Sequence, residues 1–218
     1  MSGLFWKPRR SSSSRLPHPE ICSPHGLDAA SLAVDRFRLD SVFRPNHRDY
    51  SNSLMCRQLH QAPLTHSKEP MSDSTFAFAQ EGLRRAKAID CFDFVPSDSS
   101  LLHAILVNIP RGRYCEWGSG IGIAVGLAAS LGFEACGFEI DPDLAAASRS
   151  LLADFGLSAI VTTGSYFDDH PAADVYFTYC WPGQMIKVEE HLLKVAPQES
   201  RLLICHGAQD IRCKIKDL

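Results

Sequence analysis

The chain has 218 residues, 45% of them apolar, and a formal net charge of −3, which suits one ordinary hydrophobic core. No apolar run reaches the ~18 residues of a membrane-spanning helix, so we expect a cytoplasmic protein that does not enter a membrane. The eight cysteines are scattered singly without a C-x-x-C pair. This spacing disfavours a zinc site or a disulfide framework and predicts free, buried thiols and no metal.

Charge divides the chain at about residue 70. Residues 1–70 hold ten Lys and Arg against six Asp and Glu, whereas residues 71–218 hold twelve against nineteen. The first part is rich in Ser, Pro and His and lacks hydrophobic periodicity, so it cannot offset the entropy of ordering it. We therefore expect a mostly disordered basic tail over 1–70, with a short helix at 29–43, and a folded domain over 71–218. The opening residues of the tail resemble a transit peptide, although the early prolines disfavour a targeting helix. An extension upstream of a start at Met71 is a further alternative, and a dispensable tail is the favoured interpretation.

Helix and strand patterns alternate from residue 71 onward. Helix formers at helical spacing occupy 75–89, and a second helical pattern follows a Ser/Asp-rich turn and ends before Pro110. Five strand-like runs follow, separated by turns or helical segments: RYCEW, EACGFEI, AIVTTGSYF, ADVYFTYCW and RLLIC. Asp141 is suited to cap the helix that starts at Pro142. This alternation predicts an α/β fold with a Rossmann-like, doubly wound, mostly parallel sheet.

A glycine turn follows the first of these strands. In Gly118-Ser119-Gly120-Ile121-Gly122 the glycines permit a tight turn that brings the backbone and a helix N-terminus close to a ligand. The dinucleotide fingerprint requires a small residue where this chain has Ile123, and the G-x-x-x-x-G-K-[ST] phosphate loop is absent. Glu116, two residues before the turn, would repel a pyrophosphate but would pair with an ammonium group. Glu139, which ends the next strand, can accept hydrogen bonds from both hydroxyls of a ribose.

The motifs YCEWGSGIG and GFEIDPDL together resemble the first two motifs of class I S-adenosylmethionine-dependent methyltransferases, over roughly residues 93–215. The resemblance implies S-adenosylmethionine as the cofactor and a sheet order of 3-2-1-4-5 for the five strands. The cofactor-binding residues it implies are Glu116, Gly118, Ser119, Gly120, Glu139, Ile140 and Ser165. The glycine turn would line the methionine end, Glu139 would hold the ribose and Ile140 would pack on the adenine. Ser165 stands where family members often have an Asp that reaches the adenine amino group.

The C-terminal end departs from the family pattern. Family members usually finish with a helix and an antiparallel hairpin of two strands, whereas only DIRCKIKDL follows RLLIC. We therefore expect a sheet that is shortened at its C-terminal end, with one short antiparallel strand after RLLIC. The lost elements normally form part of the substrate-binding wall, so a partner subunit is a candidate to complete the pocket.

Two residues are candidates for the catalytic side of the site. Trp181 ends the fourth strand-like run, at the edge where open α/β sheets bind ligands, and is either a ligand platform or a plug between loop and helix. His206 follows RLLIC and is either a base or a solvated turn residue. Cys180 is expected to be a buried thiol rather than a nucleophile.

The predicted function is methyl transfer from S-adenosylmethionine to an unidentified acceptor, with a protein side chain or a small molecule favoured. The segment DFVPS resembles the entry motif of minimal protein-lysine methyltransferases. Nucleic acid is disfavoured because phosphate contacts need a basic surface and the domain is acidic. Two alternatives stay open: a non-catalytic cofactor- or partner-binding module of the same fold, and a dinucleotide-binding oxidoreductase.

Overall fold

The computed structural model describes residues 58–89, 95–168 and 170–218. Its elements in chain order are β1 (Leu59–Ala62), α1 (Asp73–Ala86), α2 (Ser99–Leu106), β2 (Arg113–Trp117), α3 (Ile123–Ser130), β3 (Glu134–Glu139), α4 (Pro142–Asp154), β4 (Ala159–Thr163), β5 (Val175–Thr178), the 3₁₀ turn η2 (Pro182–Gln184), α5 (Met185–Val195), β6 (Arg201–Gly207) and β7 (Asp210–Lys216). The helix expected at 29–43 and the tail before residue 58 lie outside the described residues. None of the helices described is both long and apolar enough to cross a membrane.

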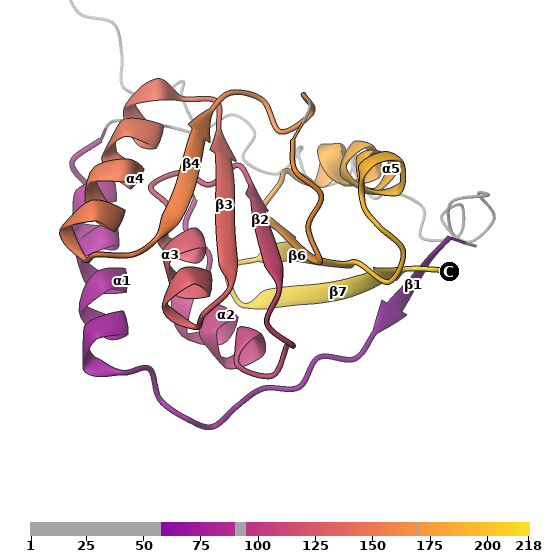
Figure 1. Cartoon of the computed structure of the whole chain (residues 1–218), viewed down its shortest axis with the longest axis horizontal. Coiled ribbons are helices and arrows are strands. Elements are labelled where there is room, and N and C mark those ends of the chain that lie inside the picture. Colours follow the sequence, from indigo (N-terminus) through magenta and orange to yellow (C-terminus); the bar gives the residue numbers. More distant parts are fainter. Residues whose placement is uncertain (1–57, 90–94, 169) are drawn as a thin grey trace, which may run out of the picture. The chain divides into compact units, whose positions relative to one another are not determined.

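The described strands form one sheet in the order β1-β7-β6-β5-β2-β3-β4 (Figure 1). The five neighbouring strands β6, β5, β2, β3 and β4 run parallel to one another. Strand β7 folds back antiparallel on β6. Counted along the five strand-like runs, the parallel part has the order 3-2-1-4-5. The predicted fold class and the predicted terminal antiparallel strand are therefore confirmed.

The edge strand β1 was not expected. Its residues pair antiparallel with β7, Leu59 opposite Lys216 and Ala62 opposite Cys213, although the sequence pattern favoured a disordered tail there. Leu59 is only 7% exposed and belongs to the core on the α5 side of the sheet. Only one antiparallel strand, β7, follows β6, as predicted. The described sheet nevertheless has seven strands, because β1 from the N-terminal side of the domain adds the edge strand. Four residues are too few to show the alternation by which a strand is recognised in a sequence.

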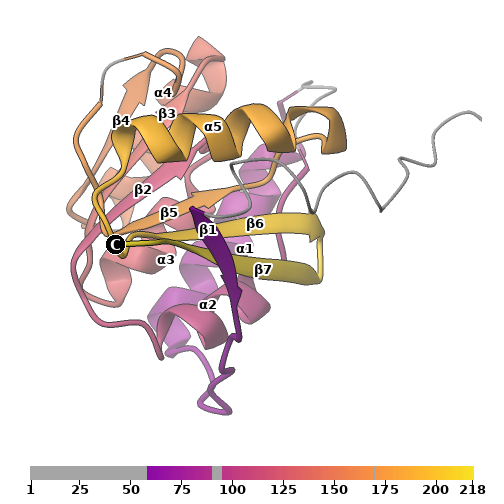
Figure 2. The same ribbon diagram turned by 90° about the vertical axis from the view of Figure 1, so that its right-hand side faces the viewer.

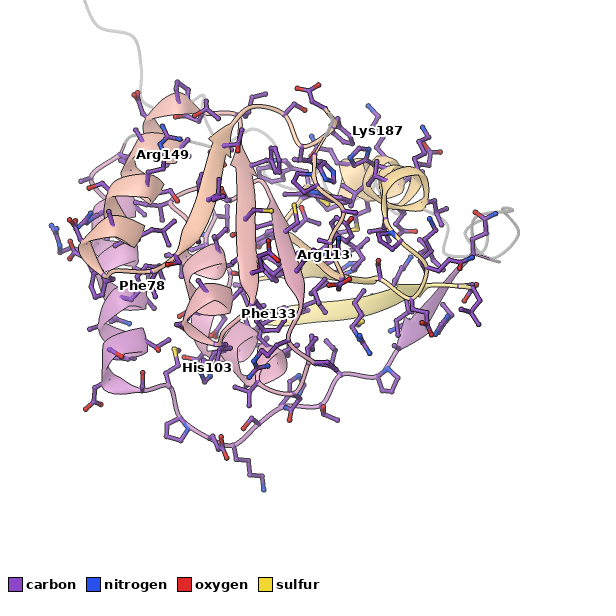
Figure 3. All side chains as sticks on the ribbon, in the orientation of Figure 1. Phe78, His103, Arg113, Phe133, Arg149 and Lys187 are labelled. Carbon is purple, nitrogen blue, oxygen red and sulfur yellow. The ribbon has the colours of Figure 1, made fainter. Side chains whose placement is uncertain are left out.

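Helices cover both faces of the sheet, as the doubly wound prediction requires (Figure 2). On one face the side chains of α1 to α4 form the larger core, which includes Phe78 (Figure 3). The rings of Phe78 and Phe155 meet there edge to face, with centroids 5.4 Å apart. On the other face, α5 packs Val188 and Leu192 against Trp117. This arrangement leaves the carboxyl ends of the parallel strands uncovered.

Polar side chains fix where the helices start. Asp141 caps α4, its Oδ1 accepting the N–H groups of Asp143 (2.9 Å) and Leu144 (3.0 Å), as predicted. Asp98 caps α2, and its own N–H donates to the carbonyl of Ala208 in the turn between β6 and β7 (3.0 Å). The start of α2 is thereby fastened to the end of the central sheet, which sets the position of the residues just before it.

The cysteines within the described residues are free thiols. Cys115, Cys180, Cys205 and Cys213 are buried, and Cys136 is half-buried. Their positions on strands and strand ends agree with the prediction of buried, unpaired thiols for this part of the chain.

Candidate functional site

A cavity of about 440 Å³ opens at the carboxyl ends of β2, β3 and β5. Open α/β sheets bind ligands at this edge, and the volume lies within the range of small-molecule sites. The described residues predicted to bind a cofactor all line it, namely Glu116, Gly118, Ser119, Gly120, Glu139, Ile140 and Ser165. The fold thus brings together side chains that are up to 49 residues apart in the sequence.

The glycine turn at the floor of this cavity directs its first amide groups into the protein. The N–H groups of Gly118 and Ser119 both donate to the carbonyl of Phe138 on β3, at 2.9 and 2.8 Å. The N–H of Gly120 donates to Oε2 of Glu139 at 2.6 Å. Three consecutive N–H donors therefore already have acceptors, and a bound anion would have to compete with the Phe138 carbonyl and the Glu139 carboxylate for them.

Gly122 lets α3 start close to α4. Its φ of 80° lies in the left-handed region, and a Cβ there would lie only 2.0 Å from Oγ of Ser148 on α4. Gly122 stands one residue before the position at which a dinucleotide fingerprint has its third small residue, and the packing of α3 against α4 requires a glycine there. The difference from that fingerprint has a structural cause.

Glu116 fastens the tip of β2 to the first turn of α3. Its side chain is buried, with 6% of the residue exposed, and Oε2 accepts the N–H of Val125 at 2.9 Å. A carboxyl group of the protein therefore occupies a donor at a helix N-terminus, where phosphate loops hold their ligand. Burial raises the pKa of Glu116 well above its usual range and the charge of Glu139 adds to this, while the Val125 hydrogen bond opposes both. Sequence reasoning missed this contact, because a strand position does not reveal which donor a carboxyl group reaches.

Glu139 links the glycine turn to the start of α4. One carboxylate oxygen accepts from Gly120, and the other accepts the N–H of Asp141 at 2.8 Å. Each oxygen has a further lone pair. The side chain is 7% exposed and lines the cavity, so these lone pairs are the acceptors available to a ligand's hydroxyl groups.

Two large apolar side chains are exposed at the β3 and β4 side of the cavity. Ile140 is 74% exposed and Phe167 is 45% exposed. Between them in the sequence, Ser165 accepts the N–H of Phe167 with its Oγ at 3.1 Å, so its hydroxyl shapes the loop. Exposed apolar surface at the wall of a cavity is typical of a site that covers a flat, apolar ligand. Phe167 was not singled out in the sequence, because it ends a strand-like run that continues beyond the actual strand β4.

Trp181 lines the opposite side of the cavity, at the end of β5. It is 55% exposed, and its carbonyl accepts the N–H of Gln184 in the 3₁₀ turn η2 at 2.8 Å. Val95, in the segment before α2, lines the cavity and is 46% exposed. The indole is thus open to the cavity, as a platform is, and is not enclosed between loop and helix.

His206 does not belong to this group of residues. It is exposed on β6 and is not among the described residues that line the cavity. The structure therefore gives no geometric support to the prediction that His206 acts as a base.

An aromatic cluster supports the loop that carries Tyr166 and Phe167. The ring of Tyr166 stacks on Trp117, with centroids 5.6 Å apart and planes within 10°. Nε2 of His191 on α5 lies 2.7 Å from the carbonyl of Tyr166 and 3.2 Å from Nε2 of His170. These contacts hold the loop against α5 and fix one wall of the cavity.

The thiol and one phenol that line the cavity keep their protons at neutral pH. Burial raises the pKa of Cys180 to about 11 and that of Tyr166 to about 12. Cys180 is 6% exposed, so the expectation of a buried thiol is confirmed. Within the described ranges, three or more His, Cys, Asp or Glu side chains nowhere come together in an arrangement that could hold a metal ion.

Comparison with known proteins identifies the fold. No family model and no curated protein matches the sequence. A methyltransferase from Geobacter sulfurreducens is 16% identical with a TM-score of 0.50, over 68% of this chain and 93% of the other. A methyltransferase from Podospora anserina, solved with bound S-adenosylhomocysteine, is 15% identical with a TM-score of 0.53, over 62% of this chain. The match spans 63% of the Podospora chain, less than two thirds of its length. The described residues thus have the Rossmann-like fold of class I methyltransferases, which confirms the predicted resemblance at the level of the fold.

Proposed function

We propose that the protein is an S-adenosylmethionine-dependent methyltransferase and that the cavity at the carboxyl ends of β2, β3 and β5 binds the cofactor. The observation that carries this proposal is the polarity of the cavity floor. The carboxylates of Glu139 and Asp141 and the buried carboxyl group of Glu116 surround the glycine turn, and the first three amide groups of that turn already donate within the protein. A pyrophosphate would meet the charges of Glu139 and Asp141 and three amide groups that already have acceptors. S-adenosylmethionine has a positive ammonium group, a positive sulfur, a single carboxylate and no phosphate, so its net charge suits this surface.

The lining residues fit the parts of this cofactor. Glu139 offers a lone pair on each oxygen to the two ribose hydroxyls, while its other hydrogen bonds keep the carboxylate in place. Ile140 and Phe167 provide apolar surface for the adenine. Glu116 and the turn from Gly118 to Gly120 lie at the remaining end, which we assign to the methionine part.

When bound, S-adenosylmethionine supplies a methyl group on a positively charged sulfur. The contribution of the chain is to hold the acceptor in line, to exclude water and to leave the acceptor atom uncharged or activated. Trp181 and Val95 are placed for the first two tasks, because they form the cavity wall opposite Ile140 with about half of their surface exposed. The fold that this domain shares with known methyltransferases supports the proposal.

Calorimetric titration of the full chain tests the proposed cofactor. We expect S-adenosylmethionine and S-adenosylhomocysteine to bind and NAD not to bind. Binding of NAD without binding of S-adenosylhomocysteine would reject the methyltransferase proposal in favour of the oxidoreductase. Release of S-adenosylhomocysteine on addition of a cell extract then separates an enzyme from a module that only binds the cofactor.

A further inference from the structure

The cavity has a second part whose side chains differ from those assigned to the cofactor. We call it the acceptor compartment, and it is lined by Val95, Tyr166, Tyr179, Cys180 and Trp181. Val95 precedes α2, and Tyr179, Cys180 and Trp181 follow β5. Tyr166, in the loop after β4, stacks on Trp117 at the end of β2. Assigning a ligand to this compartment rests on the proposed function, because that ligand would bind next to the cofactor.

Flat aromatic surface is the main feature of the acceptor compartment. Trp181 is 55% exposed, so a large part of its ring is open to a ligand. The Tyr166 ring cannot turn freely, because it stacks on Trp117. Rings held in this way favour another aromatic ring, which gains stacking or edge-to-face contacts beyond the apolar area that it buries.

The charge around the compartment selects against anions. Glu139 and Asp141 line the same cavity, while none of the described lining residues is a Lys or an Arg. A carboxylate or phosphate on the acceptor would therefore be repelled without a compensating partner. An uncharged ring meets no such penalty, and a ring that becomes positively charged is favoured by both the carboxylates and the aromatic faces.

The protonation states of the lining groups restrict the chemistry further. The thiol of Cys180 and the phenol of Tyr166 hold their protons at neutral pH, because burial raises their pKa values to about 11 and about 12. They cannot take a proton from an acceptor. The carboxylates of Glu139 and Asp141 lie between β3 and α4 and already accept backbone N–H groups, so the compartment itself contributes no base. An alcohol, a phenol or a protonated aliphatic amine must lose a proton to become a good nucleophile, whereas an unprotonated heteroaromatic nitrogen has a free lone pair.

The geometry points to a small, planar, uncharged nitrogen heteroaromatic molecule as the acceptor, bound in the acceptor compartment and methylated on its ring nitrogen. The ring nitrogen forms the N–CH₃ bond with its own lone pair as the S–CH₃ bond of the donor breaks. The positive charge passes from sulfur to nitrogen, and no proton is released. The product is an N-methylated cation that lies among aromatic faces and carboxylates.

Binding to the full chain saturated with S-adenosylhomocysteine tests the recognition part without any turnover. The probes are isoquinoline, 2-naphthol and 2-naphthoate, which share a bicyclic body and differ in the group they carry. We expect calorimetry to show isoquinoline binding at least about tenfold more tightly than 2-naphthoate, because only the latter is anionic. Equal or tighter binding of 2-naphthoate would contradict the inference.

Variants locate the binding in the compartment. Trp181→Ala should weaken isoquinoline binding about threefold to tenfold through lost stacking, and Trp181→Phe should restore most of it. Phe76→Ala is the matched control, because Phe76 is a 52% exposed aromatic residue on α1 that does not line the cavity. Unchanged isoquinoline affinity in Trp181→Ala would reject the placement.

Turnover with S-adenosylmethionine tests the methylated atom. We expect isoquinoline to yield N-methylisoquinolinium and to be methylated at least about tenfold faster than 2-naphthol at neutral pH. The rate should follow the protonation of isoquinoline alone and stay level from about pH 6.5 to 9, since no enzyme group has to take a proton. Faster methylation of 2-naphthol, a rate that keeps rising with pH, or no methylation of isoquinoline would overturn the assignment.

The outcomes separate the two proposals. If S-adenosylhomocysteine does not bind, the proposed function itself fails. If it binds but isoquinoline is neither bound nor methylated, the acceptor inference fails and the proposed cofactor stands.

Discussion

Gly137→Ala should displace the glycine turn of the candidate site, although Gly137 itself does not line the cavity. Gly137 is buried on β3, where an added Cβ would lie 2.7 Å from Cγ2 of Val125, 2.8 Å from Cβ of Ser119 and 3.1 Å from Oγ of Ser119. Real Cβ contacts are longer, so the side chains of Val125 on α3 and Ser119 in the glycine turn must shift, and Ser119 Cβ can do so only together with its backbone. Overpacking of this kind costs about 1–3 kcal/mol. For a domain of this size that corresponds to a fall in Tm of roughly 2–12 °C.

The same displacement should lower cofactor affinity, because the turn from Gly118 to Gly120 carries the proposed methionine subsite. Thermal unfolding measures the first effect, and calorimetry with S-adenosylhomocysteine measures the second. Gly183→Ala is the matched control, since a Cβ at Gly183 would meet nothing within 4 Å and the residue does not have a positive φ. If Gly137→Ala unfolds and binds like the parent chain, the close packing of β3 against the glycine turn is wrong.

Three further predictions test the site, the closing strand and an acid-sensitive contact. Glu116→Gln and Glu139→Ala should each weaken S-adenosylmethionine binding by about 1–3 kcal/mol, the former because the cofactor's ammonium group favours the charged form of a carboxyl group whose pKa burial raises. Only Glu139→Ala should also weaken adenosine, and calorimetry that shows equal losses for both ligands in both variants would contradict the assignment. Leu59→Ala should lower the free energy of unfolding by about 2–3 kcal/mol in a urea titration, whereas a dispensable tail predicts no change. Hydrogen bonds from Arg84 and Arg85 lower the pKa of Glu81 to about 2, so its stabilising contribution is present above about pH 4.5 and is lost as the pH falls towards 2. In Glu81→Gln the urea midpoint should therefore vary less over that range, and an unchanged pH dependence would show that the contact does not affect folding.

The sequence predicted the central part of the fold because its signals are local. Asp141 followed by Pro142 marks a helix start, and the cap forms as expected. The strand-like runs between helices also lead to a parallel sheet, since right-handed crossovers leave few arrangements open. The cavity could be placed for the same reason, because the carboxyl ends of parallel strands meet at one edge.

Contacts between distant segments could not be predicted in this way. The edge strand at Leu59–Ala62 is stabilised by pairing with β7, about 150 residues later, and its own pattern is too short to identify. The Val125 amide reached by Glu116 depends on the start of α3, which Gly122 and Ser148 determine together. Phe167 was missed at the site because the strand-like run that it ends extends beyond β4, which stops at Thr163. Val95 was noted only as part of the segment DFVPS and not as a residue of the site. His206 was chosen for its place after a strand, but that strand extends to Gly207, so the side chain lies on β6 and outside the cavity lining.

The pairing of β1 with β7 also affects when the domain can finish folding. During synthesis β1 leaves the ribosome before any other described element, but its partner in the sheet is made more than 140 residues later. Contacts of such long sequence separation form slowly, because a large loop has to close first. Until residues 210–216 have been synthesised and β1 has docked on them, the growing sheet presents an unpaired strand edge to other chains. The interval between the synthesis of these two strands is therefore the period in which the nascent protein is most exposed to misassembly.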